Sequence, residues 1–168
     1  MNIRILTEAD AQNYQTLRLR ALQTNPESFG STYEREVHFT IEQVEERIRQ
    51  AEDRFVLGAF QEDGSLMGIV LLMRELDRKS KHKATIYGMY TAPEVRGQGV
   101  GKALLIEIIN RANDFDGVEQ IHLQVIATNE SAKKLYKSLG FETYGVEPRA
   151  LKDGDRYFDE ELMVLFLK

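Results

Sequence analysis

A glycine-rich turn at residues 96–103 constrains this chain more than any other feature of its sequence. The turn, RGQGVGKA, follows residues 82–90, whose aromatic and β-branched side chains are typical of a strand, and leads into residues 103–112, whose Leu, Ile and Ala are typical of a helix. A helix that begins at such a turn presents unpaired backbone N–H groups and the positive end of its dipole. The pattern therefore predicts an anion site, and phosphate is the usual anion.

Three glycines alternate in this turn, at positions 97, 99 and 101. A single glycine would close a strand–helix junction, and each further one costs conformational entropy on folding. Arg96 and Lys102 flank the glycines and add positive charge. These residues favour a phosphate-binding turn over a merely structural one.

Two common phosphate-binding patterns fail on spacing. A Walker A loop needs a glycine five residues before the Gly-Lys pair and then Ser or Thr, but Arg96 and Ala103 occupy those positions. A dinucleotide-binding turn needs Gly-x-Gly-x-x-Gly or Ala. Counted from Gly97 the last position is Lys102, and counted from Gly99 it is Leu104. A nucleotide-binding α/β protein therefore remains only as a weak alternative.

The chain of 168 residues shows no repeat and no linker, so we expect one domain over residues 1–168. Its patterns predict an α/β fold with a mixed central sheet flanked by helices. The first half of the sheet is antiparallel, and a parallel pair surrounds the glycine turn because a helix separates its two strands. Capping patterns at Thr7 and Thr40 begin two helices, and Gly140 ends another. The expected strands are residues 2–6, 54–60, 66–74, 82–90, 120–126, 141–146 and 157–167; the expected helices are about 8–23, 41–51, 103–112 and 130–139, with a loop at 27–31.

Composition excludes several function classes. There is no cysteine, so thiolate nucleophiles and cysteine metal sites are absent, and three scattered histidines lack metal-ligand spacing; we expect no metal. A net charge of −5 disfavours nucleic acid as a partner. No apolar run approaches the ~20 residues that span a bilayer, and the start of the chain lacks a signal-peptide pattern. We expect a cytoplasmic protein with no membrane partner.

Two separate motifs resemble those of the GCN5-related N-acetyltransferase (GNAT) family. The first is Arg96-x-x-Gly99-x-Gly101 with the approach to it, residues 89–97, and the second is residues 129–141, NESAKKLYKSLGF. Their order and spacing also resemble the family's. The resemblance implies a single-domain GNAT-like fold and acetyl transfer from acetyl-CoA to a primary amine by direct attack in a ternary complex.

The resemblance also implies roles for particular residues. The turn amides would hold the pyrophosphate of CoA, and the pantetheine arm would pair with the strand end at residues 89–91, in a gap opened by the diverging strand 120–126. Tyr136 matches the residue that protonates the departing thiolate, although helical periodicity alone places it in the core. The implied cofactor-binding residues are Met89, Tyr90, Thr91, Arg96, Gly97, Gln98, Gly99, Val100, Gly101, Lys102, Asn129 and Ser131.

The acceptor side is less defined. Many relatives carry a glutamate on the strand before the turn, but residues 82–90 contain no carboxylate, which favours a water relay or an acceptor already deprotonated. Glu27 and Glu34 are alternative bases that surface exposure would explain equally well, and Phe29 and Tyr33 would pack on the acceptor. These residues suggest a small cationic amine, with a peptide or protein amino group also open. The acidic run 159–161 is most simply a solvated entry to the last strand, and attraction of a cationic amine is the alternative.

Two further expectations concern the protein as a whole. A non-catalytic acetyl-CoA or CoA sensor is the alternative to an enzyme, since it would keep the same cofactor site. A homodimer is an option because residues 162–167 form an apolar last strand that offers an edge to a second copy.

Overall fold

The computed structural model describes residues 1–167 and contains one mixed sheet of seven strands in the order β1-β2-β3-β4-β5-β7-β6. Strands β1, β2, β3 and β4 pair antiparallel with one another in that order. Strands β4 and β5 pair in parallel, and β7 pairs antiparallel with both β5 and β6. This arrangement confirms the predicted α/β fold. The strands are β1 (Asn2–Ile5), β2 (Arg54–Phe60), β3 (Leu66–Arg74), β4 (Lys83–Thr91), β5 (Gln120–Ile126), β6 (Glu142–Asp153) and β7 (Arg156–Phe166).

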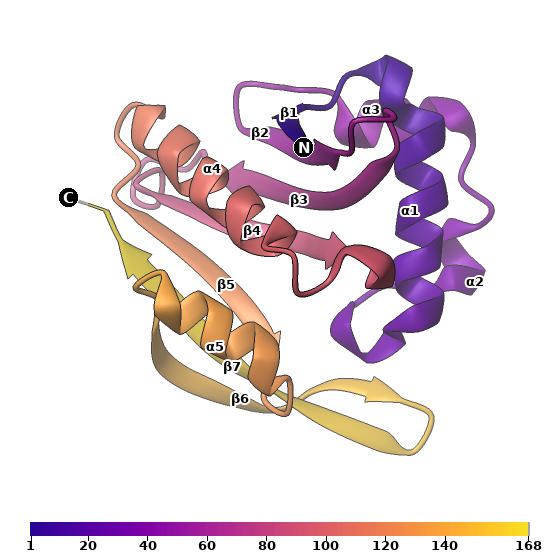
Figure 1. Cartoon of the computed structure of the whole chain (residues 1–168). Coiled ribbons are helices and arrows are strands. Elements are labelled where there is room, and N and C mark those ends of the chain that lie inside the picture. The colour runs from indigo at the N-terminus through magenta and orange to yellow at the C-terminus, as the bar shows by residue number, and fades with distance from the viewer. Residues whose placement is uncertain (168) are drawn as a thin grey trace.

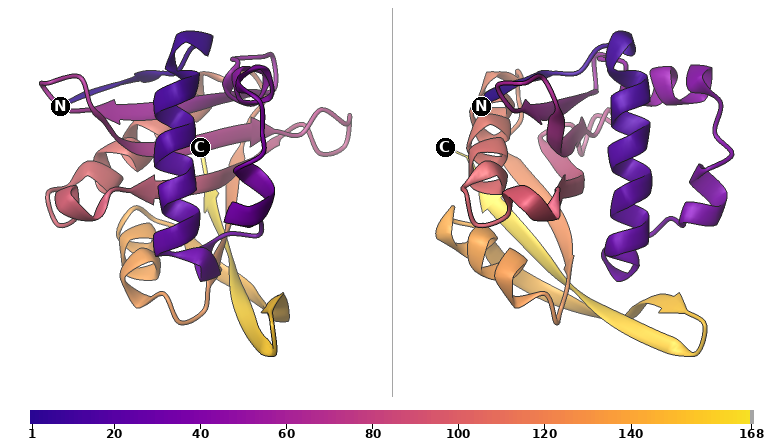
Figure 2. Two further views of the ribbon diagram at one scale, coloured as in Figure 1. Left: turned by 90° about the vertical axis from the view of Figure 1, so that its right-hand side faces the viewer. Right: turned by 45° about the vertical axis from the view of Figure 1, so that its right-hand side comes forward.

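Helices cover both faces of the sheet (Figures 1 and 2). Helix α1 lies across one face, with the short helices α2 and α3 beside it, whereas α4 and α5 lie on the other face. None of the described helices is long and apolar enough to cross a membrane. The helices are α1 (Ala11–Thr24), α2 (Tyr33–Glu36), α3 (Ile41–Ile48), α4 (Val100–Asp114) and α5 (Glu130–Ser138), with 3₁₀ turns η1 (Glu8–Asp10), η2 (Pro26–Ser28) and η3 (Pro93–Val95).

Close packing of α4 on the sheet fixes the position of the glycine turn. Leu104, Leu105 and Ile108 of α4 are fully buried. A Cβ on Gly68 of β3 would lie only 2.8 Å from Leu104 Cδ1, a distance at which atoms clash. The glycine in β3 therefore allows α4 to approach the sheet, and the start of α4 is held against the end of β4.

Several local predictions hold. Thr40 caps α3 with Gln43 in a capping box, with bonds of 2.8 and 3.2 Å. The Thr7 N–H donates to the Asp10 carboxylate at 2.8 Å as expected, but the pair begins the 3₁₀ turn η1, and α1 follows only from Ala11. Gly140 adopts φ 99° after α5.

Other predictions are wrong. The segment after α1 is not a plain loop: Pro26 begins the turn η2, and Thr32 caps the short helix α2 through the Arg35 N–H at 3.2 Å. Helix α3 ends at Ile48, before the expected 51, and β6 extends to Asp153 instead of 146. Strand β7 is also not an edge, because it pairs with β5 on one side and β6 on the other. The apolar last strand therefore offers no free edge for a dimer.

Candidate active site

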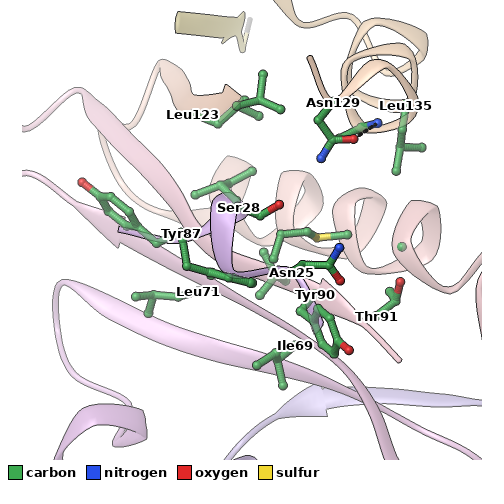
Figure 3. A pocket seen from close by; sticks show the side chains of 18 of the residues that line it. Asn25, Ser28, Ile69, Leu71, Tyr87, Tyr90, Thr91, Leu123, Asn129 and Leu135 are labelled. Carbon is green, nitrogen blue, oxygen red and sulfur yellow. Dashed lines mark hydrogen bonds between the residues drawn. The ribbon is translucent and has the colours of Figure 1, made fainter. Parts of the chain in front are cut away.

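A cavity of about 940 Å³ lies where β4 and β5 separate. Its walls include Tyr14 of α1 from one face of the sheet and Leu135 of α5 from the other, so the cavity joins the two faces. Figure 3 shows Tyr87 and Tyr90 along β4 on one side, with Leu123, Asn129 and Leu135 on the opposite side. A site that spans the sheet can receive one molecule from each face.

The separation of the strands produces this cavity. Strands β4 and β5 pair only from Lys83 and Gln120 to Thr85 and His122, although both continue well beyond. In addition, two residues of β4 oppose one of β3, because Leu71 pairs with Tyr87 and Ile69 with Tyr90. Gly88 occupies this bulge with φ 60°, and such a bulge bends its strand. The edge of β4 toward β5 is thus left without a partner strand after Thr85.

The glycine turn has a backbone geometry that suits the anion site predicted from the sequence pattern. Gly97 and Gly99 have φ values of 77° and 82°, which L side chains rarely adopt, and Gly99 is the N-cap of α4. Within residues 1–167 the amides of Val100, Gly101 and Lys102 donate to no protein acceptor. Free amides at a helix N-terminus bind phosphate through hydrogen bonds and the helix dipole.

Arg96 connects the turn to its surroundings. Its guanidinium donates to the Thr91 carbonyl at 3.1 Å and to Asn25 Oδ1 at 2.9 Å, and it lies 5.4 Å from the centroid of the Tyr90 ring. The Tyr90 hydroxyl in turn shares a hydrogen bond of 2.9 Å with Thr24 of α1. The turn, the end of β4 and the end of α1 are therefore held together as one wall of the cavity.

Helix α5 provides the opposite wall. Asn129 caps this helix, since its Oδ1 accepts from the Ala132 N–H at 3.2 Å and from the Ser131 hydroxyl at 3.3 Å. Tyr136 is buried edge-on against Phe141 with centroids 5.8 Å apart, and its hydroxyl has no hydrogen-bond partner among the described residues. Burial raises the pKa of Tyr136 to about 12, so this phenol stays protonated at neutral pH.

On the α1 face, a buried ion cluster lies beside the cavity. Glu36 is fully buried and accepts two hydrogen bonds of 3.0 Å from Arg18 and one of 2.6 Å from Arg47. Burial alone would raise the pKa of Glu36, but hydrogen bonds from Arg18 and Ser31 and the charges of both arginines lower it to about 2. Arg18 and Arg47 line the cavity. The chain pattern gives no sign of this cluster, because its members are distant in sequence.

The acidic run in β7 divides between the two faces of the sheet. Glu161 binds Lys133 of α5 at 2.6 Å, so neighbouring Glu160 points to the α1 face, because successive side chains alternate. Glu160 lines the cavity. Burial and the charge of Glu147 raise its pKa. The expectation of a solvated run is wrong for Glu160, which is the one carboxylate among the described residues that lines the cavity.

The cavity brings together most residues that the sequence singled out. Four are elsewhere: Gln98 donates its side-chain amide to the Glu94 carbonyl at 3.2 Å, and Glu27, Tyr33 and Glu34 are not among the lining residues. No group of three His, Asp or Glu side chains in residues 1–167 is placed to hold a metal ion. Those that line the cavity are Phe29, Met89, Tyr90, Thr91, Arg96, Gly97, Gly99, Val100, Gly101, Lys102, Asn129, Ser131 and Tyr136.

Comparison with known proteins identifies the family. The profile of the Acetyltransferase (GNAT) domain matches residues 3–162. The chain belongs to this family. Its sheet order and family together exclude the alternative of a nucleotide-binding protein with a different fold.

The GNAT-family acetyltransferase of Streptococcus pneumoniae superposes with a TM-score of 0.87 at 22% identity, covering 99% of both chains. The GCN5-related N-acetyltransferase of Kribbella flavida gives 0.83 at 25% identity, covering 99% of this GNAT chain and 97% of the other.

Curated relatives of this GNAT chain act on different acceptors. The mycothiol acetyltransferase of Brachybacterium faecium is 32% identical over 86% of the chain, which spans 42% of that protein. The L-amino acid N-acetyltransferase of Escherichia coli is 30% identical, with 60% of this chain and 62% of the other covered. The ribosomal protein bS18-alanine N-acetyltransferase of the same species is 27% identical, with 67% and 72% covered. The chain thus spans less than half the length of the mycothiol enzyme that it matches.

Proposed function

We propose that this protein transfers an acetyl group from acetyl-CoA to a primary amine, by direct attack of the amine in a ternary complex. The observation that carries the proposal is the cavity through the sheet, which reaches from the free amides of the glycine turn to Tyr14 and Arg18 of α1. A donor bound on the α4 and α5 face can then meet an acceptor from the α1 face without a covalent enzyme intermediate. Membership of the GNAT family and the named acetyltransferase relatives support the same reaction.

The residues on the donor side suit CoA. The amides of Val100, Gly101 and Lys102 would bind its pyrophosphate, and the Lys102 side chain adds positive charge. A Cβ on Gly101 would lie 3.1 Å from Met89 Cε, so glycine here preserves space between the turn and β4. The unpaired edge of β4 near Met89 offers backbone groups to the pantetheine amides, as an added strand would.

Two side chains would transfer the protons of the reaction, one as general acid and one as general base. Acetyl-CoA supplies the acetyl group as a thioester, and the new amide bond forms as the carbon–sulfur bond breaks. Tyr136, protonated and lining the cavity, would give its proton to the sulfur. Glu160 would take the proton that the amine loses, directly or through water, since a raised pKa brings a carboxylate closer to the range of an effective base. The turnover ends with free CoA and the acetylated amine.

The test separates binding from turnover. Isothermal titrations with acetyl-CoA, ATP and NAD should show that the protein binds acetyl-CoA and neither of the other two. Release of free thiol in the presence of a panel of amines should then report transfer, and Tyr136→Phe should reduce that release while acetyl-CoA still binds. Failure to bind at millimolar acetyl-CoA would refute the proposal. Tight binding without thiol release for any amine would instead identify a cofactor sensor.

A further inference from the structure

Arg18 carries a free guanidinium nitrogen in the cavity wall, beside the bulge of β4. Its side chain is only 6% exposed, and its Nε and Nη2 both donate to Glu36 at 3.0 Å. The remaining nitrogen, Nη1, has no hydrogen-bond partner within residues 1–167 and is not enclosed by protein atoms. Nη1 lies 3.6 Å from the position that a Cβ on Gly88 would take. A buried arginine therefore presents two N–H donors to the cavity beside the bulge of β4.

The charge around this nitrogen is positive. Arg18 and Arg47 share the single carboxylate of Glu36, so the three groups carry one net positive charge. Arg54 adds another guanidinium to the cavity lining, whereas Glu160 is the one carboxylate there among the described residues. Arg18 is buried and paired with Glu36, whereas Arg47 is 32% exposed, so the surplus charge is partly solvated and attracts anions into the cavity. The part of the cavity that α1 lines thus favours a ligand with a negative group.

We infer that Arg18 binds a carboxylate of the acceptor, so that the substrate is an amino acid or a closely related amine that carries a carboxylate beside its amino group. This inference rests on the proposed acetyl transfer. Guanidinium and carboxylate match in shape and charge. Because only one carbon separates the two groups of an α-amino acid, a carboxylate on Nη1 keeps the amine beside Gly88 and Met89.

The surroundings of Arg18 complete the match. Phe29 packs 4.8 Å from the Arg18 guanidinium and lines the cavity with Tyr14 and Leu71, so an apolar substrate side chain has a surface to contact. Glu160 provides the negative group for the amine. The sequence suggested a plain cationic amine from Glu27 and Glu34, but neither lines the cavity. A substrate with both charges fits the observed distribution better.

Matched acceptors test this directly on the native protein. Thiol release is measured with L-leucine, L-leucinamide and isopentylamine, and again with L-phenylalanine, L-phenylalaninamide and phenethylamine. A hydrogen-bonded charge pair predicts that kcat/KM for the amino acid exceeds that for the amine and amide by about 10- to 100-fold. The amine of the amide is less basic than that of the amino acid, so a larger fraction of it is deprotonated at neutral pH. This difference favours the amide and therefore works against the expected preference.

Variants assign the preference to Arg18. Because Arg18→Met alone would leave Glu36 with one partner fewer, the double variant Arg18→Met/Glu36→Gln removes both, and Arg47, which is 32% exposed, is left to solvent. Arg111→Met, in a partly exposed ion pair of α4, is the control. The double variant should accept all three forms with similar kcat/KM and an unchanged Kd for acetyl-CoA, while the control keeps the preference.

The outcomes separate two failures. A native protein that binds no acetyl-CoA refutes the proposed function, and this inference with it. A native protein that binds acetyl-CoA but prefers the amine or the amide, or accepts none of the three forms, overturns the carboxylate site alone. A double variant that still prefers the amino acid also overturns it.

Discussion

Two arginines of α1 provide a matched test of what burial does to an ion pair. Arg18 makes two contacts of 3.0 Å to Glu36, and Arg20 makes contacts of 2.8 and 2.7 Å to Glu94. The geometry is similar, but Arg18 and Glu36 are 6% and 0% exposed, whereas Arg20 and Glu94 are 42% and 52% exposed. A difference between Glu36→Gln and Glu94→Gln therefore reports burial together with the additional contact of Glu36 to Arg47, not the distances to the arginines of α1.

The expected effects differ widely. Glu36→Gln removes the only carboxylate shared by Arg18 and Arg47 and leaves buried positive charge without a counterion, which costs about 3 to 5 kcal/mol. In a domain of this size that corresponds to a fall in melting temperature of about 6 to 20 °C. Glu94 lies in water, where solvent screens the pair, so Glu94→Gln should change the melting temperature little.

The assay is thermal and urea unfolding followed by circular dichroism, with both variants and the native protein measured from pH 7 down to pH 2. The pKa of Glu36 falls from 4.5 to about 2 on folding. A lowered pKa means that the carboxylate stabilises the fold fully above pH 4.5, and that this contribution disappears as the pH falls toward 2. The gap between the native protein and Glu36→Gln should therefore close over that range. Equal losses for the two variants, or a gap independent of pH, would refute the reasoning.

Three further predictions concern the site. Gly99→Ala forces alanine to φ 82°, which costs about 1 to 2 kcal/mol, and titration calorimetry should show weaker acetyl-CoA binding. Tyr136→Phe should lower kcat by about 10²- to 10⁴-fold with an unchanged Kd for acetyl-CoA; an unchanged kcat would exclude it as the acid. Glu160→Gln should abolish the rise of rate with pH, since the base acts when ionised. Glu147→Gln removes a charge that raises the pKa of Glu160, so that rise should move to lower pH; a profile that does not move would exclude Glu160.

Features that depend on neighbours in sequence could be predicted. The turn at Gly97 to Gly101 and the capping box at Thr40 are written in short patterns, and the structure places both as expected. The parallel pairing of β4 and β5 also followed from the helix between them. Each of these depends on local backbone geometry, which residue type controls directly.

Features that depend on partners far along the chain could not be predicted. Glu36 of α2 contacts Arg18 of α1. In the sequence Glu36 lies in a charged segment, where a glutamate is indistinguishable from an ordinary surface residue. Glu160 and Glu161 differ only in the face they occupy, and that depends on which strands flank β7. Tyr136 shows the opposite case: its periodicity indicated the core and its motif indicated the site, and it is both buried and part of the cavity lining.

Because β4 and β5 pair over a short stretch, the sheet consists of two units, β1 to β4 and β5 to β7, with few hydrogen bonds between them. Among the described residues, three paired positions, from Lys83–Gln120 to Thr85–His122, form the β4–β5 ladder that connects the first half of the sheet to the second. A ligand that hydrogen-bonds along β4 and contacts α5 would add further contacts between these two units. Hydrogen exchange of β5 and β7 should then slow when acetyl-CoA is added, even at amides that the ligand never touches. Bound acetyl-CoA would then stabilise the contact between the two halves of the sheet, in addition to donating the acetyl group.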